Sequence, residues 1–156
     1  MQLQSLNISA LKLLFLAFFV FILGCSYDPP SNEKLVKALN DTSIVMRGKI
    51  IDDLQSEYRY DYYDGYEKDS HVSKLSKQGY QGGGPTWAGI VYGAILLSDK
   101  KLLSVIRFDE EAEGLVIWSK DKESLMKIGR LIAKVKTDDK LLADCIETAK
   151  KNGRME

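Results

Sequence analysis

The sequence has few of the residues that build catalytic and metal centres, with one histidine and two cysteines among 156 residues. A nucleophile–histidine–acid triad or a multi-histidine metal site would have to be built around His71 alone. Its neighbours in the sequence complete no such site, and we expect His71 to lie in the exposed first turn of a helix. The sequence therefore predicts no enzyme activity, no metal and no cofactor.

An excess of charge is also lacking, because 22 lysines and arginines balance 22 aspartates and glutamates. This balance is not that of a generic nucleic-acid-binding protein, so we expect no nucleic-acid partner. The charge is nevertheless uneven: residues 26–69 hold 10 acidic and 6 basic side chains, whereas residues 70–156 hold 12 and 15. The excess of acids in the first half indicates either a face that binds a basic partner or an ordinary solvated surface.

The apolar run at residues 13–24 follows one cation, Lys12. As a helix it would extend about 18 Å at ~1.5 Å per residue, which is too short for a hydrocarbon core of ~30 Å. A cation followed by a short apolar run is typical of a secretory signal. We therefore interpret residues 1–24 as a signal peptide and not as a membrane span.

The run ends in Ile22-Leu23-Gly24-Cys25, which resembles the lipobox of bacterial lipoproteins. Gly24-Cys25 fits that motif better than the small-x-small site of an ordinary signal peptidase. The resemblance implies that Cys25 becomes lipidated. Ser26, where an aspartate would signal retention, implies a protein of the cell envelope anchored by lipid in the outer membrane and facing the periplasm.

The mature chain is long enough for one domain with its own core. We place a tether containing Pro29 and Pro30 at residues 25–31 and a single domain at residues 32–151. Once Cys25 is lipidated, Cys145 is the only thiol, so no intramolecular disulfide can form. Cys145 lies on the apolar side of a predicted helix and is expected to be a buried small hydrophobic residue.

Apolar periodicity predicts an α+β domain. Strands are expected at residues 44–51 and 57–63, turning near residues 52–56, and at residues 103–108 and 115–119, turning at 109–114. Helices are expected from residue 32 with Ser31 or Asn32 as the cap, around residues 72–79, at 85–97, after Asp121 and after Thr137. We predict an antiparallel sheet of about four strands, formed by two hairpins, with the helices mainly on one face.

Two segments resemble chemical motifs without completing them. The glycine loop at residues 82–84 lacks the Lys-Ser/Thr pair of a phosphate-binding loop, so its glycines are expected to serve backbone geometry. The acidic turn at 109–113 holds four carboxylates, but a glycosidase needs two that converge across a cleft. We interpret this turn as a solvated hairpin apex.

The segment at residues 57–69 is the most unusual in composition, with five tyrosines among several acids. Tyrosine offers large, rigid contact area, and neighbouring carboxylates attract a basic partner. We predict this segment as the partner-binding site and call its predicted contact residues the tyrosine strip: Glu57, Tyr58, Tyr60, Asp61, Tyr62, Tyr63, Asp64 and Tyr66. The alternative is a strand whose tyrosines only cover the sheet.

From residue 79 onward the chain resembles immunity protein family 51 of polymorphic toxin systems. The resemblance rests on the following residues and segments: Gly79, Tyr80, the glycine loop with Gly84, Trp87, the run from Ile106 to Asp109, Glu111, Ala112, the strand at 115–119 and the last two helices. Thr86 and Glu113 depart from the family pattern, and residues before 79 match nothing firmly.

The resemblance implies a small, non-catalytic protein that binds a cognate toxin and blocks it. A tryptophan that begins a buried helix is expected to be core, so we place the toxin interface on the tyrosine strip. The alternative function is an envelope structural or assembly lipoprotein that binds another outer-membrane component through the same strip. A wall hydrolase is the third possibility, and it predicts loss of activity when Glu111 or His71 is replaced.

Overall fold

The computed structural model describes residues 27–52, 56–63 and 71–155. Over this part of the chain, four strands form one antiparallel sheet: β1 (Lys49–Asp52), β2 (Tyr58–Tyr62), β3 (Ile106–Glu110) and β4 (Leu115–Ser119). Their order is β1-β2-β4-β3, so the two predicted hairpins join along β2 and β4 and leave β1 and β3 at the edges. The predicted α+β class is confirmed.

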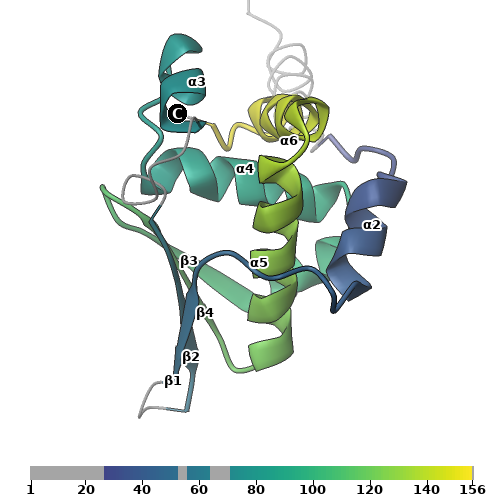
Figure 1. Cartoon of the computed structure of the whole chain (residues 1–156), viewed down its shortest axis with the longest axis vertical. Helices are drawn as coiled ribbons and strands as arrows, with labels where there is room; N and C mark the ends of the chain where they lie inside the picture. The colour runs from purple at the N-terminus through teal and green to yellow at the C-terminus, as the bar shows by residue number, and fades with distance from the viewer. Residues whose placement is uncertain (1–26, 53–55, 64–70, 156) are drawn as a thin grey trace, which may run out of the picture.

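Helices lie on one side of this sheet (Figure 1). They are α2 (Glu33–Asn40), α3 (His71–Lys77), α4 (Gly84–Leu96), the 3-10 helix η3 (Lys100–Ser104), α5 (Lys122–Lys136) and α6 (Asp139–Lys151). α4 and α5 contact the sheet, whereas α6 packs on α4 and α2 packs on α5. The other face of the sheet carries none of these helices, and we call it the outer face (Figure 1).

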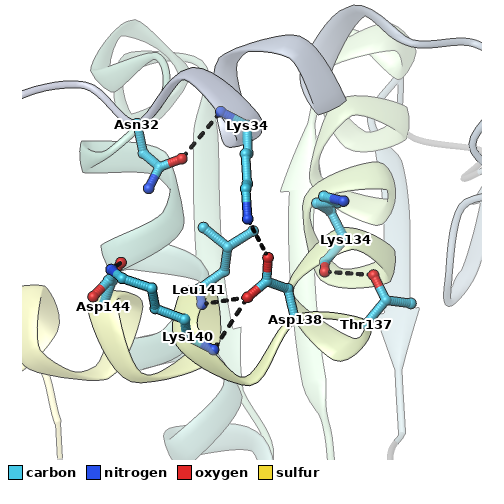
Figure 2. Close-up of polar contacts among 8 residues, drawn as sticks. All are labelled: Asn32, Lys34, Lys134, Thr137, Asp138, Lys140, Leu141 and Asp144. Carbon is cyan, nitrogen blue, oxygen red and sulfur yellow. Dashed lines mark hydrogen bonds and ion pairs between the residues drawn. The ribbon is translucent and has the colours of Figure 1, made fainter.

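Polar side chains cap the N-termini of three of the α-helices, as expected. Asn32 caps α2, and Asp121 caps α5 by accepting from the N–H groups of residues 123 and 124. The last cap differs from the prediction: Asp138, and not Thr137, accepts from the backbone of α6 (Figure 2). The hydroxyl of Thr137 instead donates to the carbonyl oxygen of Lys134 and completes the end of α5.

Two predicted strands begin later than their apolar residues suggested. Before Lys49, the backbone N–H of Arg47 donates to the carbonyl oxygen of Gly129 in α5 and does not pair with the backbone of β2. Before Ile106, the side chain of Asp99 caps η3 and turns residues 100–104 into a 3-10 helix. In both places a hydrogen bond to a nonadjacent element or a cap outweighs β propensity.

The core centres on α4, as its apolar sequence predicted. Trp87 is 1% exposed, and α4 approaches α6 closely at Gly93, where a Cβ would lie 2.1 Å from the carbonyl oxygen of Cys145. Cys145 is fully buried, and desolvation raises the pKa of its thiol to about 12. The expectation of a buried cysteine is confirmed.

The start of the described chain lies against the helices, although residues 25–31 were predicted to form a tether. Pro29 is buried, and Nζ of Lys100 lies 2.7 Å from a carboxylate oxygen of Asp28. Nζ of Lys151 lies 4.8 Å from the centre of the Tyr27 ring. Among the described residues, no helix has both the length and the apolar character needed to cross a membrane.

Candidate interaction face

The tyrosine strip is divided between the two faces of the sheet. Tyr60 is 0% exposed and Tyr62 1% exposed, and both face the helices. The hydroxyl of Tyr60 donates to the carbonyl oxygen of Arg47 at 2.7 Å. Nζ of Lys136 donates to the hydroxyl of Tyr62 at 2.7 Å, and the Tyr62 ring meets Trp87 edge-on at 4.9 Å. Their burial removes Tyr60 and Tyr62 from the contact surface predicted from the sequence.

The remaining described members of the strip differ in exposure. Tyr58 is half-buried and packs against the core on the same side as Tyr60. Glu57, Asp61 and Tyr63 are half-buried at or near the outer face. The other two predicted contacts, at positions 64 and 66, lie outside the described residues. The strip alone therefore does not make a continuous surface.

The outer face acquires its main features from β3 and β4, which the partner-binding prediction did not include. The strand register places Arg59, Trp118 and Arg107 in one row across β2, β4 and β3. The guanidinium carbon of Arg59 lies 5.7 Å from the Trp118 ring centre, and that of Arg107 lies 5.5 Å away. Both distances are within cation–π range, so two arginines hold one indole between them.

The two acids that the tyrosine strip contributes to the described part of this face, Asp61 and Glu57, each interact with an arginine. Asp61 accepts from Nε of Arg59 at 2.6 Å, and this hydrogen bond raises the pKa of the Arg59 guanidinium. Arg107 lies 3.6 Å from a carboxylate oxygen of Glu57. The predicted acidic surface is thus a charge-balanced surface in which cations and carboxylates alternate around an indole.

A hollow of about 530 Å³ opens to solvent at one end of this row. Its lining includes Trp118, Arg107 and Val105, of which Val105 is 48% exposed. Lys120 and Asp121 border the hollow where β4 passes into α5. An exposed apolar group surrounded by charged ones resembles the centre and rim of a protein interface.

The glycine loop supports the acidic turn. A Cβ at Gly84 would lie 2.0 Å from the carbonyl oxygen of Glu111, and one at Gly83 would lie 2.3 Å from that of Ala112. The hydroxyl of Thr86 accepts from the N–H of Gly82 at 2.9 Å and closes the loop. The loop's glycines therefore serve close packing of two backbones, as the sequence indicated.

The family-motif residues fall into two groups. Gly79 has a φ of +90° and ends α3, while Tyr80 and Trp87 are buried. Asp109 and Glu111 are exposed, in or beside the β3–β4 hairpin. The first group and Gly84 maintain the fold, whereas only the two acids are accessible to another molecule.

His71 begins α3 as expected, but it is 7% exposed and therefore buried, which corrects the expectation of an exposed residue. Within residues 27–52, 56–63 and 71–155, no group of three or more histidine, cysteine, aspartate or glutamate side chains is arranged to hold a metal ion.

One sequence signal could have identified the arginine–tryptophan row. Along residues 115–119 the apolar residues of odd number face the core, so Trp118 stands at a position that alternation assigns to the outer face. A tryptophan at that position lies outside the core. A large apolar side chain on the solvent-facing side of a sheet indicates an interaction surface.

No curated protein and no solved structure matches the chain significantly. The family model of immunity protein 51 matches residues 55–151, more than half of the chain. The resemblance noted from residue 79 therefore extends further toward the N-terminus and includes β2 with its tyrosines. The chain belongs to the immunity protein 51 family.

Proposed function

We propose that this protein is a lipid-anchored immunity protein that binds a cognate antibacterial toxin and blocks it by covering its active surface, without catalysis. Membership of the immunity protein 51 family over residues 55–151 carries the proposal. That family suggests a toxin-neutralising role, and immunity proteins are generally non-catalytic.

The outer face is the proposed toxin-binding surface. Tryptophan, tyrosine and arginine dominate the binding energy of protein interfaces, and this face combines Trp118, Tyr63, Arg59 and Arg107. Their side chains are already held by stacking and ion pairs, so association would cost little additional side-chain entropy. The outward-facing residues Glu57 and Asp61 of the predicted strip belong to this surface, whereas Tyr60 and Tyr62 support it from below.

The proposed location constrains the toxin. The signal at residues 1–24 and the lipobox at Cys25 support anchoring in the cell envelope, in the outer membrane facing the periplasm. A toxin that attacks the cell wall, lipids or the membrane is accessible there. A nuclease would be met only during its passage to the cytoplasm.

The toxin encoded beside this gene is the partner to test. Co-expression should protect cells from that toxin, and the purified proteins should form a stable complex. Replacing Trp118→Ala and Arg107→Ala together should weaken the complex by at least about 100-fold, since a hot-spot residue contributes ~2 kcal/mol or more. Lys77→Ala with Lys150→Ala is the matched control, because it removes two exposed side chains of the helices.

Two outcomes separate the parts of this proposal. If the wild-type protein neither binds the neighbouring toxin nor protects against it, the immunity function is wrong for that pair. If the wild-type protein binds but the folded double variant binds equally well, the outer face is not the interface.

A further inference from the structure

Residues 27–32 form a strap that lies across the helices. The N–H of Asn32 donates to the carbonyl oxygen of Leu97 at 2.6 Å, at the end of α4. The ion pair between Asp28 and Lys100 attaches the strap to η3, and the contact of Tyr27 with Lys151 attaches it to α6. These three contacts fix the path of the chain over the helices at the start of the domain.

The strap brings the proposed lipid very close to the domain. Only Ser26 separates Cys25 from Tyr27, and a fully extended residue spans at most about 3.6 Å, so the Cα of Cys25 lies within about 8 Å of that of Tyr27. We propose that the side of the domain that bears Tyr27 and η3 lies against the phospholipid headgroups, with the outer face directed away from the membrane. This inference rests on lipidation of Cys25, which belongs to the proposed function.

The chemistry of that side suits a headgroup surface. Tyr27 is 39% exposed, and an amphipathic ring is favoured at the boundary between lipid and water. Lys100, Lys101 and Lys151 are exposed, and lysines near a membrane are attracted by anionic lipids. Two acids on this side, Asp28 and Glu147, would oppose this attraction, but they form ion pairs with Lys100 at 2.7 Å and Lys151 at 3.6 Å.

The fold places the strap and the outer face at opposite sides of the helical layer, and η3 connects the end of α4 to β3. α4 and α5 contact the sheet, while α6 packs on α4 beyond it. Figure 1 shows the strap beside α6, on the side of the helices remote from the sheet. A toxin could thus reach Trp118 and its neighbours without displacing the domain from the membrane.

The orientation can be measured on the full-length lipoprotein in vesicles that contain phosphatidylglycerol. Nitroxide labels are attached in separate variants at Lys101→Cys, near the strap, and at Lys49→Cys, on the outer face. Cys145 is buried and stays unlabelled. A nickel chelate carried on lipid headgroups should relax the label at position 101 several-fold more strongly than the label at position 49.

A linker variant is the matched control. About ten Gly and Ser residues inserted between Ser26 and Tyr27 leave every described contact of the strap in place but add a flexible reach of roughly 17 Å. The difference between the two labels should then largely disappear. Equal relaxation at both positions in the unmodified protein, or stronger relaxation at position 49, would overturn the proposed orientation.

Failure of the orientation and failure of the proposed function give different results. If mass spectrometry finds Cys25 unmodified and the protein does not sediment with vesicles, the lipid anchor and the orientation are both wrong. Toxin binding is measured separately with the Cys25→Ser protein in solution, so a wrong orientation leaves that binding unchanged.

Discussion

The indole N–H of Trp118 donates a hydrogen bond to a carboxylate oxygen of Asp109 at 3.0 Å. Trp118 lies on β4 and Asp109 on the edge strand β3. The bond between them fixes the indole in the orientation in which the guanidinium groups of Arg59 and Arg107 lie over it. Asp109 is one of the family-motif residues. Its structural role is to orient the indole at the centre of the arginine–tryptophan row.

Replacement of that acid tests whether the orientation of the indole matters. Asp109→Ala should weaken toxin binding about tenfold, ~1.4 kcal/mol, because Trp118 loses its hydrogen bond and its fixed position. Isothermal titration calorimetry with the cognate toxin measures the change. Glu113→Ala, in the same hairpin, is the control, and equal effects of the two replacements would contradict a specific role of Asp109.

The buried tyrosines should affect stability before they affect binding. Tyr60→Ala leaves a cavity in the core and should lower the free energy of unfolding by about 3–5 kcal/mol. Tyr60→Phe keeps the ring and removes only the hydrogen bond to Arg47, so a loss of about 1 kcal/mol is expected. Urea denaturation measures both. A Tyr60→Ala protein of unchanged stability that no longer binds toxin would show that Tyr60 is a contact residue.

The contact between the glycine loop and the acidic turn predicts a strong steric effect. Gly84→Ala places a Cβ against the carbonyl oxygens of Glu111 and Gly114, and the turn must move to accommodate it. We expect a loss of about 1–3 kcal/mol in unfolding free energy, as for overpacked cores. Pro85→Ala, at the next position of the same helix, is the control. Equal thermal midpoints for the Gly84→Ala and wild-type proteins would contradict the close approach.

The junction between α2 and α6 predicts a pH dependence. Figure 2 shows that Asp138 caps α6 and forms an ion pair with Lys34. Nζ of Lys34 lies 2.8 Å from a carboxylate oxygen of Asp138. The hydrogen bond from Lys34 is the largest cause that holds the pKa of Asp138 below its ordinary value of 3.8. A carboxyl with a lowered folded-state pKa stabilises the protein above its unfolded-state pKa, and this stabilisation is lost as pH falls through the folded-state pKa.

Asp138→Asn tests this dependence, because asparagine still caps a helix but carries no charge. The difference in unfolding free energy between the wild-type and variant proteins should be constant from pH 7 to about pH 5 and should narrow below about pH 3.8. Urea titrations at a series of pH values measure it. Asp139→Asn removes a charge from the same turn as a control. A difference independent of pH down to pH 2 would contradict the role of the carboxylate.

Burial of the remaining thiol predicts that it does not react in the folded protein. Because desolvation raises the pKa of Cys145 to about 12, almost no thiolate exists at pH 8. A Cys25→Ser protein that lacks the signal should react with a disulfide reagent only after denaturant is added. Rapid stoichiometric labelling under native conditions would mean that α6 opens from α4.

Local patterns predicted most of the elements correctly where the controlling interaction is also local. Asn32 and Asp121 cap helices through backbone groups two or three residues away, and such caps can be recognised in a sequence. The helix with Trp87 was recognised by its continuous apolar residues and by Gly93. One error occurred where a distant group decided the outcome, because Gly129 binds the segment before β1. Two others were local caps that were not predicted from the sequence, Asp99 at η3 and Asp138 at α6.

The interface could be predicted only in part for the same reason. Alternation along residues 57–62 separates the tyrosines from Glu57 and Asp61, but the composition of the whole segment led to all of them being assigned to one predicted site. The partners that complete the outer face, Arg107 and Trp118, are about fifty residues away in the chain. Only the pairing of β2 with β4 brings them beside Arg59.

The sequence by itself determined the family, the α+β class, most helix starts and the two-sided character of β2, because each depends on motifs or on periods of a few residues. The tertiary structure decided which side of β2 is buried and which side chains meet on the other side. Those outcomes depend on strand order and register, since the hydrogen bonds that set them join strands far apart in the chain.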